Sequence, residues 1–143
     1  MYVAVSDLAF KTGGRDPSKG GGLFALQLTT GEKIWTALPA PCAEEKPRCS
    51  PGHSAAVSAT STAIFAGSLD GHIRAFSAAN GQVIWDFDTA REFETTNGDK
   101  ARGGSIDGPG PVIANGMLFT NSGYGMWGGM PGNVLLAFSI DGK

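Results

Sequence analysis

The segment that follows Trp85 carries most of the residue types that could bind an anionic cofactor or a metal ion. Its charged side chains are Asp86, Asp88, Arg91, Glu92, Glu94, Asp99, Lys100, Arg102 and Asp107. Arginine binds carboxylates through paired hydrogen bonds, and Ca²⁺ prefers clustered carboxylate and amide oxygens. We therefore take Arg91, Arg102 and Asp107 as candidate site residues and expect the charges at 94–100 to be solvated.

A second candidate is the glycine-rich segment 122–132, which follows Asn121 and carries Tyr124 and Trp127. These aromatic side chains could form a lid or a contact patch for a polymer, and the alternative is that they pack on their own loop. The glycine runs are not surrounded by a strand–helix–strand unit, so they predict no nucleotide site.

Cys42 and Cys49 lie in a proline-rich stretch and are separated by six residues. Two interpretations stay open: free thiols, or a disulfide formed in an oxidising compartment. A zinc site is disfavoured because only His53 and His72 could complete it. Neither histidine has a nucleophile partner, so hydrolase chemistry has no support.

The composition is typical of an all-β protein with many tight turns. The chain has 143 residues, a net charge of -2 and 22 glycines, a glycine share about twice the ordinary one. The near-neutral charge excludes a basic nucleic-acid footprint, and no stretch approaches the roughly 20 apolar residues of a transmembrane segment. No signal peptide is visible, which fits either a cytosolic protein or a piece of a longer chain.

The sequence repeats internally. Residues 22–35 align with 72–85, and a third copy begins at 133. Three pairs of equivalent residues, each 50 positions apart, mark the first two copies: Ala25 and Ala75, Gly31 and Gly81, Trp35 and Trp85. Each copy is expected to form a strand, a tight turn with glycine, and a second strand.

Further strands precede each copy, which gives a four-stranded antiparallel unit. We expect an all-β fold, a partial β-propeller of about three such blades from a ring of eight. Blade 1 spans about 1–38 and lacks its first strand, blade 2 spans about 54–89, and blade 3 spans about 110–143 and lacks its last strand. A β-sandwich is the alternative, but it does not require the same tryptophan in successive hairpins.

The expected strand order places every long connection at one face of the propeller. Residues 7–21, 36–53, 86–110 and 122–132 fall on that face, whereas the other face has tight turns only. Binding residues concentrate on long loops of a rigid scaffold, so we expect the site there. Trp35 and Trp85, with Gly31, Gly81, Ala25 and Ala75, are interpreted as packing residues that pin one blade to the next.

The repeat resembles the tryptophan-docking motif of quinoprotein (PQQ-dependent) alcohol dehydrogenases. Ala25, Thr30, Gly31 and Trp35 fit that motif, whereas Gln27 stands where the family has aspartate. The stretches 65–76, 85–93, 103–111, 121–125 and 131–133 are similar to the C-terminal blades of polyvinyl-alcohol-dehydrogenase-like proteins. The resemblance covers nearly the whole chain.

This resemblance implies an alcohol dehydrogenase that holds pyrroloquinoline quinone (PQQ) and Ca²⁺, lies in the periplasm and passes electrons to a cytochrome c. The metal ligands and catalytic base are expected mostly in earlier blades, so the chain alone should be inactive. The residues expected to contact the cofactor are Asp107, Arg91, Arg102, Asn121 and Trp127. The alternative is a non-catalytic propeller of the same type, similar to the outer-membrane assembly lipoprotein, which serves as a scaffold for protein–protein interaction in the cell envelope.

Overall fold

The structure is a computed structural model that describes residues 1–43 and 46–140, so the end of the third repeat copy, residues 141–143, lies outside the described part. Its central sheet has four antiparallel strands in sequence order. These are β6 (Val57–Ala59), β7 (Ala63–Gly67), β8 (His72–Ser77) and β9 (Val83–Asp88). Alternating burial along β8 is typical of a strand that presents one face to a core.

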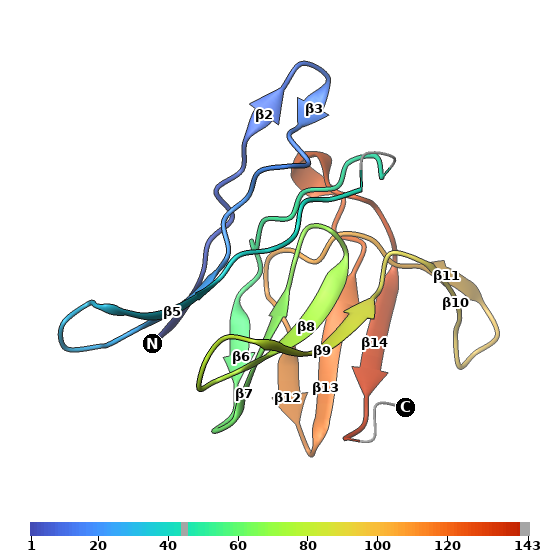
Figure 1. Cartoon of the computed structure of the whole chain (residues 1–143). Helices are drawn as coiled ribbons and strands as arrows, with labels where there is room; N and C mark the ends of the chain where they lie inside the picture. Colours follow the sequence, from blue (N-terminus) through green and yellow to red (C-terminus); the bar gives the residue numbers. More distant parts are fainter. Residues whose placement is uncertain (44–45, 141–143) are drawn as a thin grey trace.

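A three-stranded antiparallel sheet lies on each side of the central one, as Figure 1 shows. The first contains β1 (Tyr2–Ala4), β4 (Leu23–Leu26) and β5 (Lys33–Ala37). The third contains β12 (Val112–Ala114), β13 (Met117–Ser122) and β14 (Val134–Phe138). The described residues form no α-helix, and the expected partial propeller is confirmed.

The repeat extends to the details of strand pairing. Ala25 pairs with Trp35 in the first sheet, and Ala75 pairs with Trp85 in the second. In both hairpins the register shifts immediately after the alanine. Gly31 and Gly81 have φ values of 74° and 73°, which glycine adopts without the steric cost of a Cβ.

Two apolar cores lie between neighbouring sheets. Leu23 from the first sheet packs with Ile64 and Phe76 from the second. Ile73 from the second sheet packs with Leu118 and Phe138 from the third. Each sheet therefore buries one face against each neighbour, which is the stacking of propeller blades and not that of a two-layer sandwich.

Trp35 joins the first sheet to the second. Its indole nitrogen donates a hydrogen bond of 3.0 Å to the carbonyl of Ala78, and its ring covers the turn of the next hairpin. A Cβ at Gly81 would come within 2.5 Å of this ring. Trp85 packs instead against Phe87 and, edge to face at 5.2 Å, against Phe138 of the third sheet. The residues equivalent to Asn80 and Gly81 are 141–142, which lie outside the described part of the chain.

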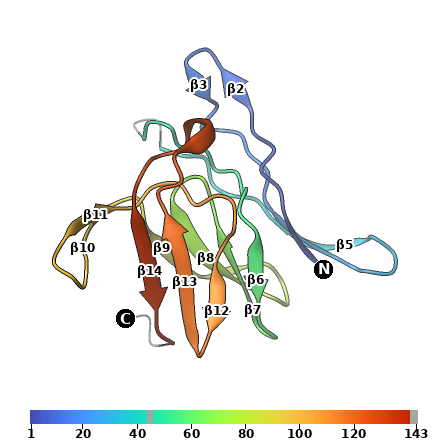
Figure 2. The same cartoon turned by 180° about the vertical axis from the view of Figure 1, so that it is seen from behind.

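The long connections gather at one end of the sheets, while the β12–β13 turn lies at the other (Figures 1 and 2). Two of them differ from the sequence expectation, because they contain short hairpins and not plain loops. These are β2 (Phe10–Lys11) with β3 (Gly14–Arg15), and β10 (Glu92–Glu94) with β11 (Lys100–Arg102). Gly13 and Gly98, at φ values of 96° and 83°, allow the chain to reverse inside segments too short to show strand periodicity. A single 3₁₀ turn, η1 (Met126–Gly128), lies in the segment after β13.

Candidate functional site

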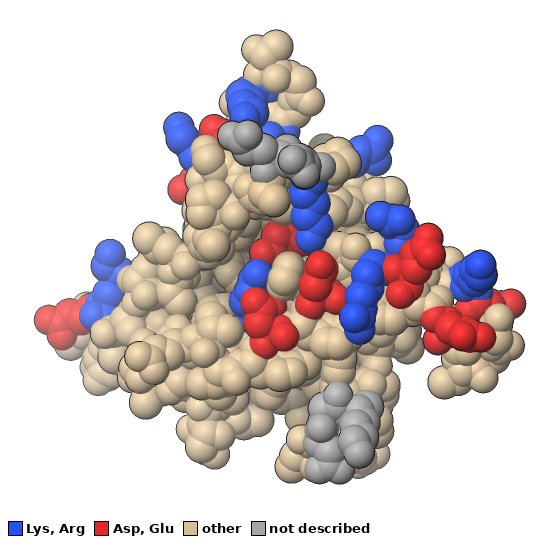
Figure 3. Space-filling view, turned by 45° about the vertical axis from the view of Figure 1, so that its right-hand side comes forward, with Lys and Arg blue, Asp and Glu red and all other residues tan. Residues whose placement is uncertain are grey.

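Charged side chains gather near the end of the sheets that carries the long connections. Figure 3 shows acidic and basic groups alternating across the middle of one view, above a lower region without charge. Arg74 forms the centre of one network, because its guanidinium contacts Asp70 at 2.8 Å and Asp86 at 3.1 Å. The carboxylate of Asp86 also accepts a hydrogen bond of 2.6 Å from Nδ1 of His72. This network joins β8 to β9 and the short connection before β8.

The ion pair between Asp70 and Arg74 keeps both groups charged. Burial opposes ionisation of Asp70, but hydrogen bonds from Arg74, Ser68 and the His72 amide outweigh it, so the pKa of Asp70 lies below its ordinary value. Burial likewise opposes the charge of Arg74, but Asp70 and Asp86 outweigh it and raise the pKa of Arg74. The sequence analysis did not single out Asp70, in the turn before β8, or Arg74, on β8.

The structure joins Cys42 and Cys49 in a disulfide. The loop that it closes reaches the second sheet, because Nζ of Lys46 donates to the carbonyl of Asp70 at 2.8 Å and lies 3.7 Å from the carboxylate of Asp88. A cleft of about 590 Å³ separates this loop from the segments after β9 and η1. It is lined by Ala43, Lys46, Pro47, Arg48, Ala90, Arg102, Gly103, Met130 and Pro131.

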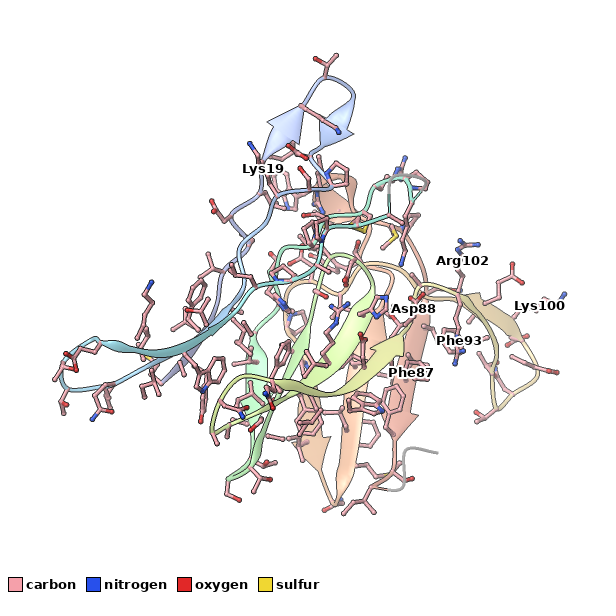
Figure 4. All side chains as sticks on the ribbon, viewed as in Figure 1. Lys19, Phe87, Asp88, Phe93, Lys100 and Arg102 are labelled. Carbon is pink, nitrogen blue, oxygen red and sulfur yellow. A yellow bond between two sulfur atoms is a disulfide. The ribbon has the colours of Figure 1, made fainter. Side chains whose placement is uncertain are left out.

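Arg91 and Arg102, both expected at a cofactor, occupy different surroundings. Arg102 lies on β11 and lines the cleft. The Arg91 guanidinium lies over two aromatic rings, 4.6 Å from the centre of Phe87 and 5.1 Å from that of Phe93. Figure 4 shows these two phenylalanines near the base of the β10–β11 hairpin. The Arg91 guanidinium contacts both aromatic rings, and these contacts fix the direction in which its charge points.

The other three expected site residues lie on separate elements. Asp107 precedes β12 and accepts a hydrogen bond of 2.7 Å from the Gly108 amide. Asn121 is exposed on β13, opposite Leu135. Trp127 is 79% exposed in η1 and has a left-handed backbone with φ of 54°. The five expected residues therefore come from different elements of the structure.

Arg15 is a candidate that the sequence analysis missed. Its side chain is only 9% exposed, and its Nη2 donates a hydrogen bond of 2.6 Å to the carbonyl of Trp127. Nε and Nη1 are buried and have no hydrogen-bond partner among the described residues. Burial lowers the pKa of Arg15, and Asp107 partly offsets this effect. The available signal was an arginine after two glycines inside a long insertion.

Buried hydrogen-bond donors without acceptors raise the free energy of the folded protein. Nε and Nη1 of Arg15 therefore indicate that an anion or another part of the protein supplies their acceptors. A carboxylate fits a guanidinium through paired hydrogen bonds. The described residues do not offer a comparable site for Ca²⁺. They contain no group of three or more His, Cys, Asp or Glu side chains that could hold a metal ion. This part of the chain thus fits a carboxylate ligand and offers no metal centre of that kind.

Comparison with protein families identifies the family to which this propeller belongs. A family model described as outer membrane protein assembly factor BamB matches residues 5–141. The chain belongs to this family of PQQ-repeat propellers. The helices of the described residues include none that is long and apolar enough to cross a membrane.

Two curated relatives are similar to this member of the family over its whole length. The polyvinylalcohol dehydrogenase of Pseudomonas sp is 43% identical over 155 residues, and that of Sphingopyxis sp. (strain 113P3) is 45% identical over 156 residues. Each alignment covers 100% of this chain and 23% of the relative. The chain therefore spans about a quarter of the length of these enzymes.

Solved structures agree on the fold. BamB from Moraxella catarrhalis aligns with a TM-score of 0.54 at 19% identity, over 86% of this chain and 33% of its own. The computationally designed Ika4 protein aligns with a TM-score of 0.51 at 14% identity, over 95% of this chain and 66% of its own. At these identities the likeness concerns the arrangement of strands and not activity.

Proposed function

We propose that this chain is part of a PQQ-dependent dehydrogenase that oxidises alcohol groups, in polyvinyl alcohol or related secondary alcohols, and passes the electrons to a cytochrome c. The observation that carries the proposal is the 43–45% identity to two polyvinylalcohol dehydrogenases across the whole chain. A periplasmic location belongs to the same proposal, and the disulfide between Cys42 and Cys49 supports an oxidising compartment.

The cofactor contact that the geometry supports best involves Arg15. PQQ carries three carboxylates, and one of them could bind Nε or Nη1 of Arg15, which lie on different edges of the guanidinium, once the loops that bury these atoms move apart. Asp107 interacts electrostatically with the same guanidinium. When bound, the quinone would accept the hydride from the alcohol carbon. Arg91, Arg102 and Asn121 remain proposed contacts on the same face. Any Ca²⁺ ligands would come from other parts of the protein, together with the catalytic base.

The direct test is reconstitution of the full-length protein that we propose contains this chain. The protein is incubated with PQQ and Ca²⁺, and oxidation of a secondary alcohol is followed with an artificial electron acceptor. The proposal predicts PQQ-dependent dye reduction and a bound-quinone absorption spectrum. Absence of both the activity and the quinone spectrum would contradict it.

A variant separates cofactor binding from overall folding. Arg15→Gln removes the charge that would pair with a carboxylate, so PQQ should bind roughly tenfold more weakly, as expected for a lost charge-assisted hydrogen bond. Lys19→Gln is the matched control, because Lys19 is an exposed cation on the same insertion (Figure 4). Equal PQQ affinity in Arg15→Gln and the control would remove Arg15 from the cofactor site.

A second candidate function is a non-catalytic scaffold in the cell envelope. The description of the matching family and the likeness to BamB favour it. It predicts no quinone binding and a protein partner on the face that carries the long connections. Recovery of the same partner from cell extracts with and without PQQ would support the scaffold over the enzyme.

A further inference from the structure

Four large apolar side chains stand exposed on two long connections at the same end of the molecule. Phe10 on β2 is 69% exposed and Trp127 is 79% exposed, with Met126 and Tyr124 beside it in sequence at 57% and 42%. Figures 1 and 2 both show the β2–β3 hairpin next to η1. Together we call Phe10, Tyr124, Met126 and Trp127 the aromatic platform. Large exposed apolar side chains that gather at one end of a molecule mark a candidate binding surface.

One hydrogen bond ties the two halves of the platform together. Phe10 and Arg15 are directly opposite in the β2–β3 hairpin, so their side chains leave the same face. Arg15 then donates its 2.6 Å bond to the carbonyl of Trp127, 112 residues further along the chain. The hairpin that carries Phe10 and the backbone of Trp127 are therefore joined through a buried arginine.

The backbone also holds the indole outward. Trp127 adopts φ of 54° and ψ of 28°, a left-handed conformation that residues with a Cβ rarely adopt. Such conformations persist only where surrounding contacts impose them, and they occur preferentially at functional sites. Here the contacts include the Arg15 bond and a bond from the Gly129 amide to the Met126 carbonyl. The chain thus maintains an unfavourable backbone that leaves a large ring in solvent.

From this arrangement we infer that the aromatic platform binds a stretch of an uncharged, hydroxylated aliphatic polymer such as polyvinyl alcohol. The inference rests on the proposed function, because that function supplies the polymer substrate. The platform side chains carry no charge, which suits an uncharged ligand. Methylene groups of the polymer would lie on the rings, while its hydroxyls would stay hydrated or reach the Tyr124 hydroxyl.

The test measures polymer binding without turnover. The full-length protein migrates through native gels that contain increasing amounts of polyvinyl alcohol, and its retardation gives an apparent dissociation constant. Trp127→Ala and Phe10→Ala should each bind the polymer about tenfold more weakly, as expected when part of a large apolar contact is lost. Leu28→Ala is the matched control: Leu28 is 77% exposed but lies beside the tight turn at Gly31, so this variant should be retarded like the wild type.

The outcomes separate this inference from the proposed function. If retardation by the polymer depends on Trp127 and Phe10 but the protein oxidises no alcohol, the inference about the platform stands and the proposed dehydrogenase function is wrong. A protein that oxidises alcohols while both variants are retarded like the wild type would overturn the platform. Lower thermal stability of Trp127→Ala with unchanged retardation would also overturn it, because another blade would then cover these rings.

Discussion

At the scale of single residues, His53 is a buried histidine with an unpartnered ring nitrogen. Its side chain is 1% exposed, packs edge to face on Phe76 at 5.9 Å, and leaves Nδ1 without a hydrogen-bond partner in the described residues. Burial lowers its pKa, although the nearby Asp70 opposes this effect. The folded state therefore favours the neutral imidazole.

This environment predicts a loss of stability in mild acid. Because the unfolded chain protonates His53 near its ordinary pKa of about 6.5 and the folded chain resists protonation, the stabilisation is complete above that pH and declines as the pH falls below it. Between pH 6.5 and 5.5 the loss is at most about 1 kcal/mol, the limit in which the folded chain binds no proton at His53. Urea unfolding at pH 8 and 5.5 measures it.

His53→Gln serves as the comparison, because it removes the titrating group from the same place. Its stability should change less than that of the wild type between the two pH values. An equal change in both proteins would show that His53 does not carry the effect.

The sequence located the charged segment after Trp85 but not the role of each charge in it. Arg91 was singled out for its chemistry, and it proves to contact the rings of Phe87 and Phe93. Arg15 was overlooked, because its burial depends on a contact with residue 127 at the far end of the chain. Residue type predicts possible chemistry, whereas burial and free donors depend on tertiary contacts that no local pattern encodes.

At the scale of elements, the loop closed by Cys42 and Cys49 connects the first long insertion to the second sheet. The Cys42 amide donates to the carbonyl of Pro17 in the first long insertion, and Lys46 reaches Asp70 at the end of the second sheet. The sequence left the redox state of these cysteines open, since spacing alone does not bring two sulfur atoms together.

The disulfide should stabilise the protein by about 2 kcal/mol, the entropy of closing so short a loop in the unfolded chain. Urea unfolding with and without a reducing agent measures this contribution. The double variant Cys42→Ser, Cys49→Ser should match the reduced wild type and be insensitive to the reductant. Equal stability of the oxidised and reduced wild type would contradict the prediction.

The indole of Trp35 contacts the second hairpin from the first. Trp35→Ala should cost about 3 kcal/mol by removing a packed aromatic ring. Trp35→Phe should cost about 1 kcal/mol, because it keeps a ring over Gly81 and loses the hydrogen bond to Ala78. Thermal unfolding of the two variants tests this order.

The control is Trp127→Phe, which changes an exposed tryptophan and should alter stability by less than about 0.5 kcal/mol. A Trp35→Ala protein as stable as this control would show that the indole does not join the sheets.

The repeat predicted the hairpins well, because a glycine turn and a fixed tryptophan are local signals. The turns at Gly31 and Gly81, with φ values of 74° and 73°, are two such signals that the structure bears out. The short hairpins β2–β3 and β10–β11 were missed, because two or three residues per strand carry no measurable alternation.

At the scale of the whole molecule, the two ends of the sheets have different characters. One end carries the ion-pair network, the cleft and the aromatic platform, whereas tight turns such as Asn115–Gly116 lie at the other (Figures 1 and 3). Large apolar side chains are also exposed on the outer sheets, among them Ile34 on β5 and Leu135 on β14. Such surfaces fit the proposal that further blades pack on both sides of this chain.

A crystal structure of the full-length protein with bound PQQ tests the central claim most directly. Our account predicts a closed propeller in which Trp85 covers the turn after β14 as Trp35 covers Gly81, with the quinone at the end that carries residues 122–132. Trp35 and Trp85 in unrelated surroundings, or a quinone at the end that carries the Asn115–Gly116 turn, would contradict it.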